Sequence, residues 1–197
     1  MSYLPKSERR IAIIEATLRQ VAQVGFGGLT TRGIAQELGA APGTIHHNFA
    51  SLTDLKCAAL QHMADAEFAR YDSLIANLPM DQALLQMLVP DSGSDTALIA
   101  RVWISAADEA TRSDQVGAVF AEAVNQSQSR LAAFLTAYHS RLGCNAKFSP
   151  DLLAWKLLAL STSLSDFQIS GKVLINRDQI LGLIQDELAN SLCGDKR

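Results

Sequence analysis

The stretch TTRGIAQELGAAPGTIHHNF, residues 30–49, decides the fold predicted for this chain. Apolar residues four positions apart share one helix face, and two such pairs occur here: Ile34 with Leu38, and Ile45 with Phe49. Between the pairs, Gly39 can end one helix, and Pro42 suits the first turn of the next, where the missing N–H of a proline is not needed. The stretch therefore predicts two short helices joined by a tight turn.

The second of these helices has two chemically different sides. At 100° per residue, the face opposite Ile45 carries Gly43, Thr44 and His47, and His46 and Asn48 flank it. A helix that enters the major groove of DNA needs such a side, with short groups where the backbone approaches and hydrogen-bonding groups that reach base edges. The pattern therefore predicts a recognition helix.

Helical periodicity continues through nearly the whole chain, and strand signals are almost absent. A preceding amphipathic helix ends at Gly25, and Thr30 or Thr31 can cap the helix that runs to Leu38. The later helices are expected at 51–79, in a short segment before the loop 90–95, and at 96–110, 113–142, 150–170 and 177–193. The fold class predicted is all-α, with a three-helix head over residues 1–56 and a larger helical body over residues 57–197.

Composition limits the classes of protein that fit. The chain has 197 residues, 48% of them hydrophobic and 19% charged, which is too apolar for disorder, and no run reaches the length of a membrane span. Three widely spaced cysteines, Cys57, Cys144 and Cys193, and no secretory signal favour a cytoplasmic protein with reduced thiols. The net charge is +2 over residues 1–56 and −5 over the remainder, which indicates a small anion-binding head on an acidic body.

Enzyme motifs are missing from the sequence. The glycines of GFGGLT, residues 25–30, follow a helix rather than a strand and lack the third glycine of a dinucleotide-binding loop. His46 and His47 are adjacent, so on a helix they point about 100° apart and do not readily share one metal ion. We therefore expect no catalytic residues, no metal and no cofactor.

The first 60 residues resemble the TetR family of bacterial transcriptional regulators. The resemblance is carried by the apolar stripe of the first helix, by Gly25, and by the segments LTTRGIAQELG, GTIHHNF and SLTDLKCAAL. It implies phosphate contacts from Thr31, Arg32 and Lys56, base-edge contacts from Thr44, His47 and Asn48 beside the small Gly43, and a place near the backbone for His46. The N-terminal cations Lys6, Arg9 and Arg10 are expected to add backbone contacts, whereas the HHN triplet, where tyrosines are common in the family, leaves the operator sequence open.

The resemblance also implies a homodimer that binds two half-sites of a palindromic operator, most often as a repressor. In the family the last two helices pair with a second subunit. Candidate residues here are leucines and isoleucines at helical spacing: Leu153, Leu157, Leu160, Leu164, Ile180, Ile184 and Leu188. The alternative for this stripe is that it fills the core of a single subunit.

The helical body is expected to hold a small-molecule effector whose binding releases the operator. The candidate lining residues are Trp103, Asp108, Phe120, Trp155 and Phe167. Large aromatic rings together with acidic groups, including Glu109 and Asp166, suit a cationic ligand. The segment ALSTSLSDFQISGK resembles, more weakly, the closing helices of choline-responsive repressors of the betaine pathway.

Two other classes of protein remain open at this stage. One is a helical small-molecule-binding protein or enzyme with a degenerate DNA-binding head, which would bind no DNA. The other is an architectural DNA-binding protein without effector control, which would bind most duplexes alike. A salt-sensitive complex with one preferred sequence distinguishes a regulator from both.

Overall fold

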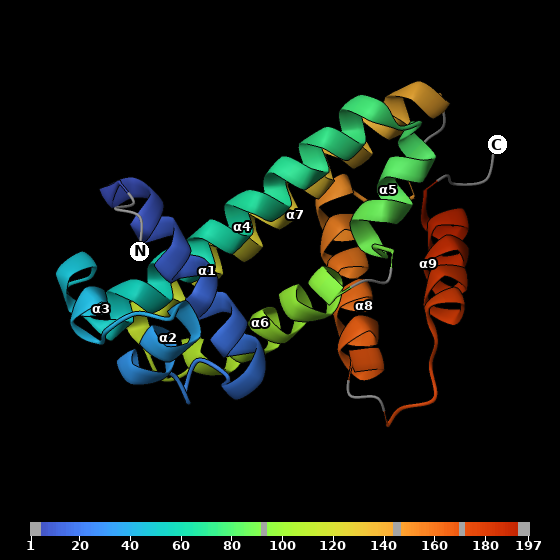
Figure 1. The fold of residues 1–197 in the computed structure, drawn as a ribbon. Coiled ribbons are helices and arrows are strands. Elements are labelled where there is room, and N and C mark those ends of the chain that lie inside the picture. Colours follow the sequence, from blue (N-terminus) through green and yellow to red (C-terminus); the bar gives the residue numbers. More distant parts are fainter. Residues whose placement is uncertain (1–4, 92–93, 144–146, 170–171, 193–197) are drawn as a thin grey trace. The chain divides into compact units, whose positions relative to one another are not determined.

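A computed structural model describes residues 5–91, 94–143, 147–169 and 172–192 (Figure 1). Within these ranges every regular element is a helix, which confirms the all-α prediction. The helices are α1 (Lys6–Val24), α2 (Thr31–Leu38), α3 (Gly43–Asn48), α4 (Leu52–Asn77), α5 (Met80–Leu88), α6 (Ser94–Ala110), α7 (Asp114–Leu142), α8 (Pro150–Ile169) and α9 (Arg177–Ser191).

The chain divides into two compact units. Unit 1 comprises Met1–Ala66 and Ala97–Ala123, and unit 2 comprises Glu67–Thr96 and Val124–Arg197. The chain passes from one unit to the other inside α4, α6 and α7, so each of these crossings lies within a helix. The division into a head over 1–56 and a body over 57–197 stays a prediction.

Unit 1 holds α1, α2 and α3, the first part of α4, nearly all of α6 and the start of α7. Its core includes Ile13, Ile34 and Ile45 from the first three helices, Leu55 from α4 and Val102 from α6, each at most 2% exposed. The head is therefore packed on α6 as well as on its own helices.

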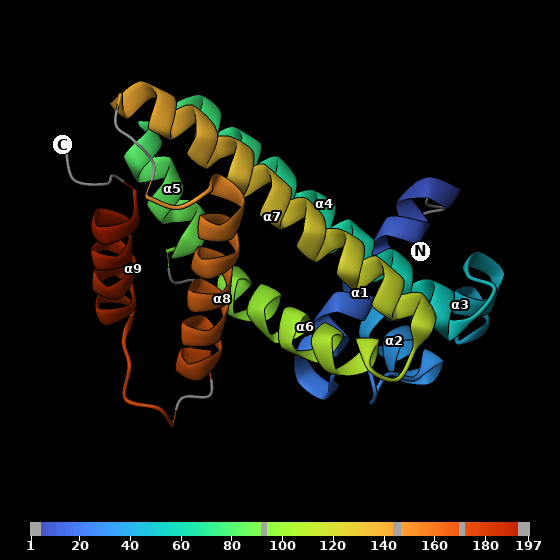
Figure 2. The ribbon, with the colours of Figure 1, turned by 180° about the vertical axis from the view of Figure 1, so that it is seen from behind.

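Unit 2 holds α5, α8 and α9 with the second parts of α4 and α7, and α8 and α9 lie side by side in both views (Figures 1 and 2). Its core contains most of the apolar residues that the sequence offered to a second subunit. Leu153, Leu157, Ile180, Ile184 and Leu188 are buried in it, and Leu160 and Leu164 pack against it. Five of the seven residues therefore fill the core of one subunit, whereas Leu160 and Leu164 are half-buried.

Helix ends lie where the capping residues predict them. Thr30 accepts a hydrogen bond from the Gly33 N–H and caps α2, and Gly39 ends the helix in the left-handed region at φ 68°. Asn176 and Gln179 form a reciprocal capping box at the start of α9. A search of the described residues finds no helix that is both long enough and apolar enough to span a membrane.

Candidate DNA-binding interface

The helix α3 presents the two sides that the sequence predicted. Ile45 is 2% exposed and Phe49, just past the helix, is 5% exposed, and both belong to the core of unit 1. On the other side Gly43, His46 and His47 are exposed, and Thr44 is half-buried. A Cβ added at Gly43 would meet no atom within 4 Å, so the backbone there is open to close approach by a ligand.

One cation and one hydroxyl group lie at the start of α2. Arg32 is exposed and Thr31 is half-buried, both in the first turn of the helix. Among the residues that the structure describes, none forms a hydrogen bond or ion pair with the Arg32 guanidinium. A free cation beside a helix N-terminus is a favourable partner for a phosphate group.

Asn48 is less free than the sequence suggested. Its Nδ2 donates a hydrogen bond of 2.8 Å to the Thr44 carbonyl oxygen, one turn earlier in α3, and the residue is half-buried. The side chain therefore closes the short helix, and its remaining amide proton and oxygen are the groups left for a base or phosphate.

Lys56 lies in an ion pair instead of on the surface. Its Nζ is 2.6 Å from Glu109 Oε1, and the two side chains are only 13% and 9% exposed. The Glu109 carboxylate also faces Arg112, at 3.7 Å, and Arg112 binds the exposed Asp108 as well. Lys56 thus joins α4 to α6 within unit 1, and we leave it out of the interface proposed below.

Arg10 also has a partner inside unit 1. Its Nη1 donates a hydrogen bond of 2.7 Å to the Asn48 carbonyl oxygen, and its guanidinium carbon lies 4.0 Å from the centre of the Phe49 ring. Lys6 is exposed and has no side-chain partner among the described residues. The sequence assigned both residues to DNA backbone contacts and gave no signal of the contact between Arg10 and α3.

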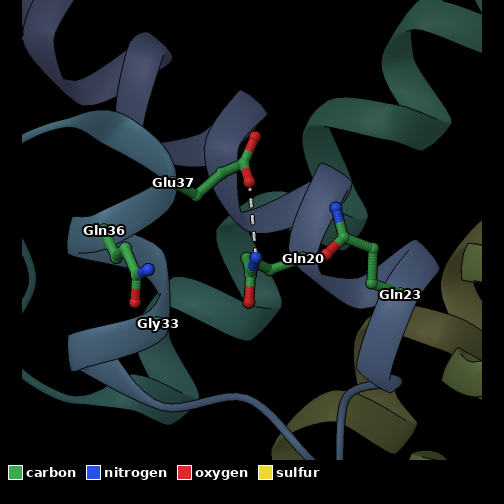
Figure 3. A pocket seen from close by; sticks show the side chains of 5 residues that line it. All are labelled: Gln20, Gln23, Gly33, Gln36 and Glu37. Carbon is green, nitrogen blue, oxygen red and sulfur yellow. Dashed lines mark hydrogen bonds between the residues drawn. The ribbon is translucent and has the colours of Figure 1, made fainter.

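A polar groove of ≈ 390 Å³ separates α1 from α2 and is lined by Gln20, Gln23, Gly33, Gln36 and Glu37 (Figure 3). Across it, Glu37 accepts hydrogen bonds of 2.9 Å from Arg19 and 3.4 Å from Gln20. These hydrogen bonds hold the pKa of the Glu37 carboxyl below its ordinary value, and the bond from Arg19 has the larger effect. The groove therefore contains a polar clamp that fixes α2, and with it the turn before α3, against α1.

Three residues of α6, spaced four apart, bind three parts of the head. Arg101 donates to the Ala22 carbonyl oxygen at 3.5 Å, the Ser105 hydroxyl accepts from the Phe26 N–H at 2.7 Å, and Glu109 holds Lys56. We call Arg101, Ser105 and Glu109 the α6 seam. Sequence reasoning missed its role, because serine, arginine and glutamate on a helix surface are ordinary and their partners lie far away in the chain.

The five residues predicted to line an effector pocket fall in both units. In unit 1 the rings of Trp103 and Phe120 meet edge to face, 5.9 Å apart, whereas Asp108 is exposed and bound to Arg112. In unit 2 Trp155 and Phe167 lie on α8 and are 44% and 51% exposed. The structure thus brings two of the five into contact, and an effector pocket made by all five stays a prediction.

The described residues contain no cluster of three or more side chains placed to hold a metal ion. Burial raises the pKa of the Cys57 thiol, which lowers the fraction of reactive thiolate at neutral pH. Cys144 and Cys193 lie outside the described residues.

Comparison with known proteins bears on the head and on the whole chain. The family model "Bacterial regulatory proteins, tetR family" matches residues 13–55, which include α2 and α3. The chain is 25% identical over 193 residues to the HTH-type transcriptional regulator PksA of Bacillus subtilis, covering 96% of this chain and 93% of that one. It is 30% identical over 97 residues to the HTH-type transcriptional regulator BetI of Burkholderia thailandensis, covering 48% and 49% of the two chains.

Solved structures share the fold over nearly the full length. A TetR-family transcriptional regulator from Rhodococcus sp. superposes with a TM-score of 0.81 at 20% identity, covering 94% of this chain and 99% of the other. A protein from Saccharomonospora viridis described as a transcriptional regulator, solved in complex with choline, gives a TM-score of 0.80 at 23% identity over 93% and 96% of the chains. The helix-turn-helix segment thus matches the TetR family model, and a transcriptional regulator aligns with almost the entire chain, so the similarities support a TetR-family transcriptional regulator.

Proposed function

We propose that this protein is a sequence-specific repressor that binds a palindromic operator as a homodimer, in the cytoplasm, and leaves it when a small molecule binds the body. The observation that carries the proposal is the outer side of α3. There, Gly43, His46 and His47 are exposed over a side buried through Ile45 and Phe49. Such a helix can enter a major groove without losing its packing.

The roles of the interface residues follow from their chemistry. Thr44 and His47 offer a hydroxyl and an imidazole to base edges, and Gly43 lets the backbone approach. Arg32 and Thr31 at the start of α2 bind phosphates, which fixes the register of α3 along the duplex. His46 and the free part of the Asn48 amide lie beside them and add contacts to the backbone or to a neighbouring base.

The dimer is proposed to form through the outer side of α8. Leu152, Trp155 and Phe167 are 65%, 44% and 51% exposed on this helix, and Leu183 on the neighbouring α9 is 46% exposed. Ala159, Thr162 and Ser163 between them are small enough to let a second helix approach closely. Large exposed apolar side chains of this kind mark an interaction surface.

The effector is proposed to be a small organic cation. The S. viridis protein of the same fold holds choline. In this chain Asp166 on α8 is half-buried, and its burial raises the pKa of the carboxyl, so a cation that replaces lost water would be a favourable partner. The first probe is choline itself, measured as a shift in Tm of the wild type and of Asp166→Asn. A shift that Asp166→Asn retains unchanged would contradict the role of this carboxylate.

The experiment that tests DNA recognition is selection from a pool of random duplexes by the purified protein. A palindromic consensus is expected, with half-sites about one helical turn apart, since two copies of α3 must reach adjacent major grooves on one face. Enrichment of no sequence by a folded protein at low salt would refute the proposal. Equal retention of all duplexes would instead indicate an architectural protein.

A further inference from the structure

The helix α3 is too short to hold its own shape. It has six residues, Gly43–Asn48, and no side chain caps its N-terminus. Isolated helices of this length are unstable in water, so the orientation of α3 depends on contacts with the rest of unit 1. Ile45 and Phe49 supply the apolar part of these contacts on one side of the helix.

The C-terminal end of α3 is held by a residue of α1. The last carbonyl groups of a helix lack partners within it, and the Asn48 carbonyl accepts a hydrogen bond of 2.7 Å from Arg10 Nη1. The carbon of the same guanidinium lies over the Phe49 ring, 4.0 Å from the ring centre. One side chain therefore fixes both the last residue of α3 and the aromatic residue that follows it.

This double contact requires the shape of arginine. A guanidinium is planar and can donate a hydrogen bond from its edge while its face covers an aromatic ring, whereas a lysine ammonium is a compact charge that cannot do both. A phosphate contact, in contrast, depends chiefly on charge, so lysine can replace arginine there. The two possible roles of Arg10 thus predict different results for Arg10→Lys.

We propose that Arg10 is a positioning residue that sets the orientation of α3, and thereby determines DNA sequence specificity without touching a base. The Asn48 side chain ties the end of α3 back to the Thr44 carbonyl, so a shift at Asn48 is passed to Thr44 and His47, the groups offered to base edges. Base recognition tolerates only small displacements of such groups. The inference rests on the proposed function, recognition of an operator by α3.

The test compares the full-length wild type with Arg10→Lys, Arg10→Gln and Lys6→Gln. Lys6→Gln is the matched control, since it removes one charge from the same helix at an exposed residue with no partner among the described ones. For each protein, Kd is measured for the selected operator and for a scrambled duplex of the same length, over a series of salt concentrations. Circular dichroism at the binding temperature establishes that each variant is folded.

Both Arg10 variants are expected to lower the ratio of specific to non-specific affinity about tenfold, which is the size of one lost or misplaced base contact. Arg10→Lys is expected to leave the salt dependence unchanged, and Lys6→Gln to leave the specificity ratio unchanged. Amide hydrogen exchange of the free proteins provides a readout without DNA. Exchange in residues 44–49 should become faster in both Arg10 variants, and exchange in α2 should not.

Three results would overturn the inference. Arg10→Lys could keep the wild-type specificity ratio and exchange rates, so that charge alone suffices. Arg10→Gln could weaken both duplexes equally and reduce the slope of log K against log salt by about 0.9, the effect of one lost phosphate contact. If the wild type itself prefers no sequence, the proposed function fails first, and Arg10 has no specificity to set, whatever the exchange rates of α3.

Discussion

At the scale of single residues, Gly25 combines two constraints. Its φ of 72° and ψ of 168° lie in a region that L side chains rarely adopt, and a Cβ there would lie 3.0 Å from the Ser105 hydroxyl oxygen. We expect Gly25→Ala to lower the free energy of unfolding by about 1–3 kcal/mol, measured by urea denaturation.

The matched control is Gly39→Ala. Gly39 also has a positive φ, 68°, but a Cβ there would meet no atom within 4 Å. It therefore reports backbone strain alone, which costs about 1 kcal/mol in the left-handed helical region. An equal loss of free energy of unfolding in both variants would show that the Ser105 side chain moves to make room for the methyl group added at Gly25.

Glu37 gives unit 1 a small dependence on acid. Its pKa is held below the ordinary value by hydrogen bonds from Arg19 and Gln20, so the stability that it contributes is present at neutral pH and is lost as the pH falls through the folded-state pKa. We expect Glu37→Gln to lower the free energy of unfolding by less than about 1 kcal/mol at neutral pH, because the clamp is open to solvent.

At acid pH the wild-type carboxyl is protonated and is therefore uncharged, as glutamine is. The difference in free energy of unfolding between Glu37→Gln and the wild type should then shrink. Denaturation at both pH values measures it. Glu8→Gln, an exposed residue of α1, is the control and should show no such pattern. A difference that stays constant with pH would mean that the charge of Glu37 is not what matters.

At the scale of elements, the contact between α4 and α6 depends on the pair of Lys56 and Glu109. The side chains are 13% and 9% exposed, so removal of the Glu109 carboxylate would leave the Lys56 ammonium group buried without its partner charge. We expect Glu109→Gln to lower the free energy of unfolding by about 3 kcal/mol, measured by urea denaturation.

Asp108→Asn is the control for Glu109→Gln, because it removes the same charge from the adjacent residue of α6. Asp108 is exposed and pairs with Arg112, which is exposed as well, so little or no change in stability is expected. The double variant Lys56→Met with Glu109→Leu should recover much of the stability, since it leaves no unpaired charge. Similar losses for Glu109→Gln and Asp108→Asn would contradict the distinction between the two pairs.

Helix positions could be predicted from the sequence because their causes are local. The Thr30 cap, the stop at Gly39 and the four-residue spacing of Ile45 and Phe49 act within one or two turns, and the structure confirms them. The partners of the helices could not be predicted in the same way. Phe26 and Ser105 are 79 residues apart, and Arg10 and Asn48 are 38 apart, so no local pattern joins them.

In the candidate site, too, the features with local causes could be predicted and those that depend on distant partners could not. The exposed side of α3 follows from helical geometry. Lys56, for which the resemblance implies a phosphate contact, lies in an ion pair that the sequence did not indicate, because Glu109 comes from a distant helix. On α8, the pattern of leucines indicated an apolar side but not what covers it. Leu153 and Leu157 are fully buried, and the neighbouring Leu152 and Trp155 are exposed.

At the scale of the whole molecule, the exposed side chains of α8 predict the oligomeric state. We expect Leu152→Glu with Trp155→Glu to convert the proposed dimer to a monomer, because two added negative charges on each subunit would face those of the other subunit across the proposed two-fold interface. Analytical ultracentrifugation measures the mass, and affinity for the selected operator should fall with it.

Ile75→Glu is the control for this variant. Ile75 on α4 is 44% exposed, as Trp155 is, and belongs to unit 2 as well, but it is not on α8 or α9. It should leave the mass unchanged. A monomeric wild type, or a charged double variant that remains dimeric, would show that the subunits pair elsewhere.

The α6 seam has a further consequence for how the contacts between α6 and the head can break. Arg101, Ser105 and Glu109 are spaced four residues apart and span about 80° of the circumference of α6, so one rotation of the helix about its own axis would carry all three away from their partners. Contacts that break in the same movement break cooperatively, in one step, instead of one after another. A change that requires α6 to rotate would therefore be cooperative. Removing one of the three contacts would lower the free energy needed for the rotation but would leave the other two contacts to break together.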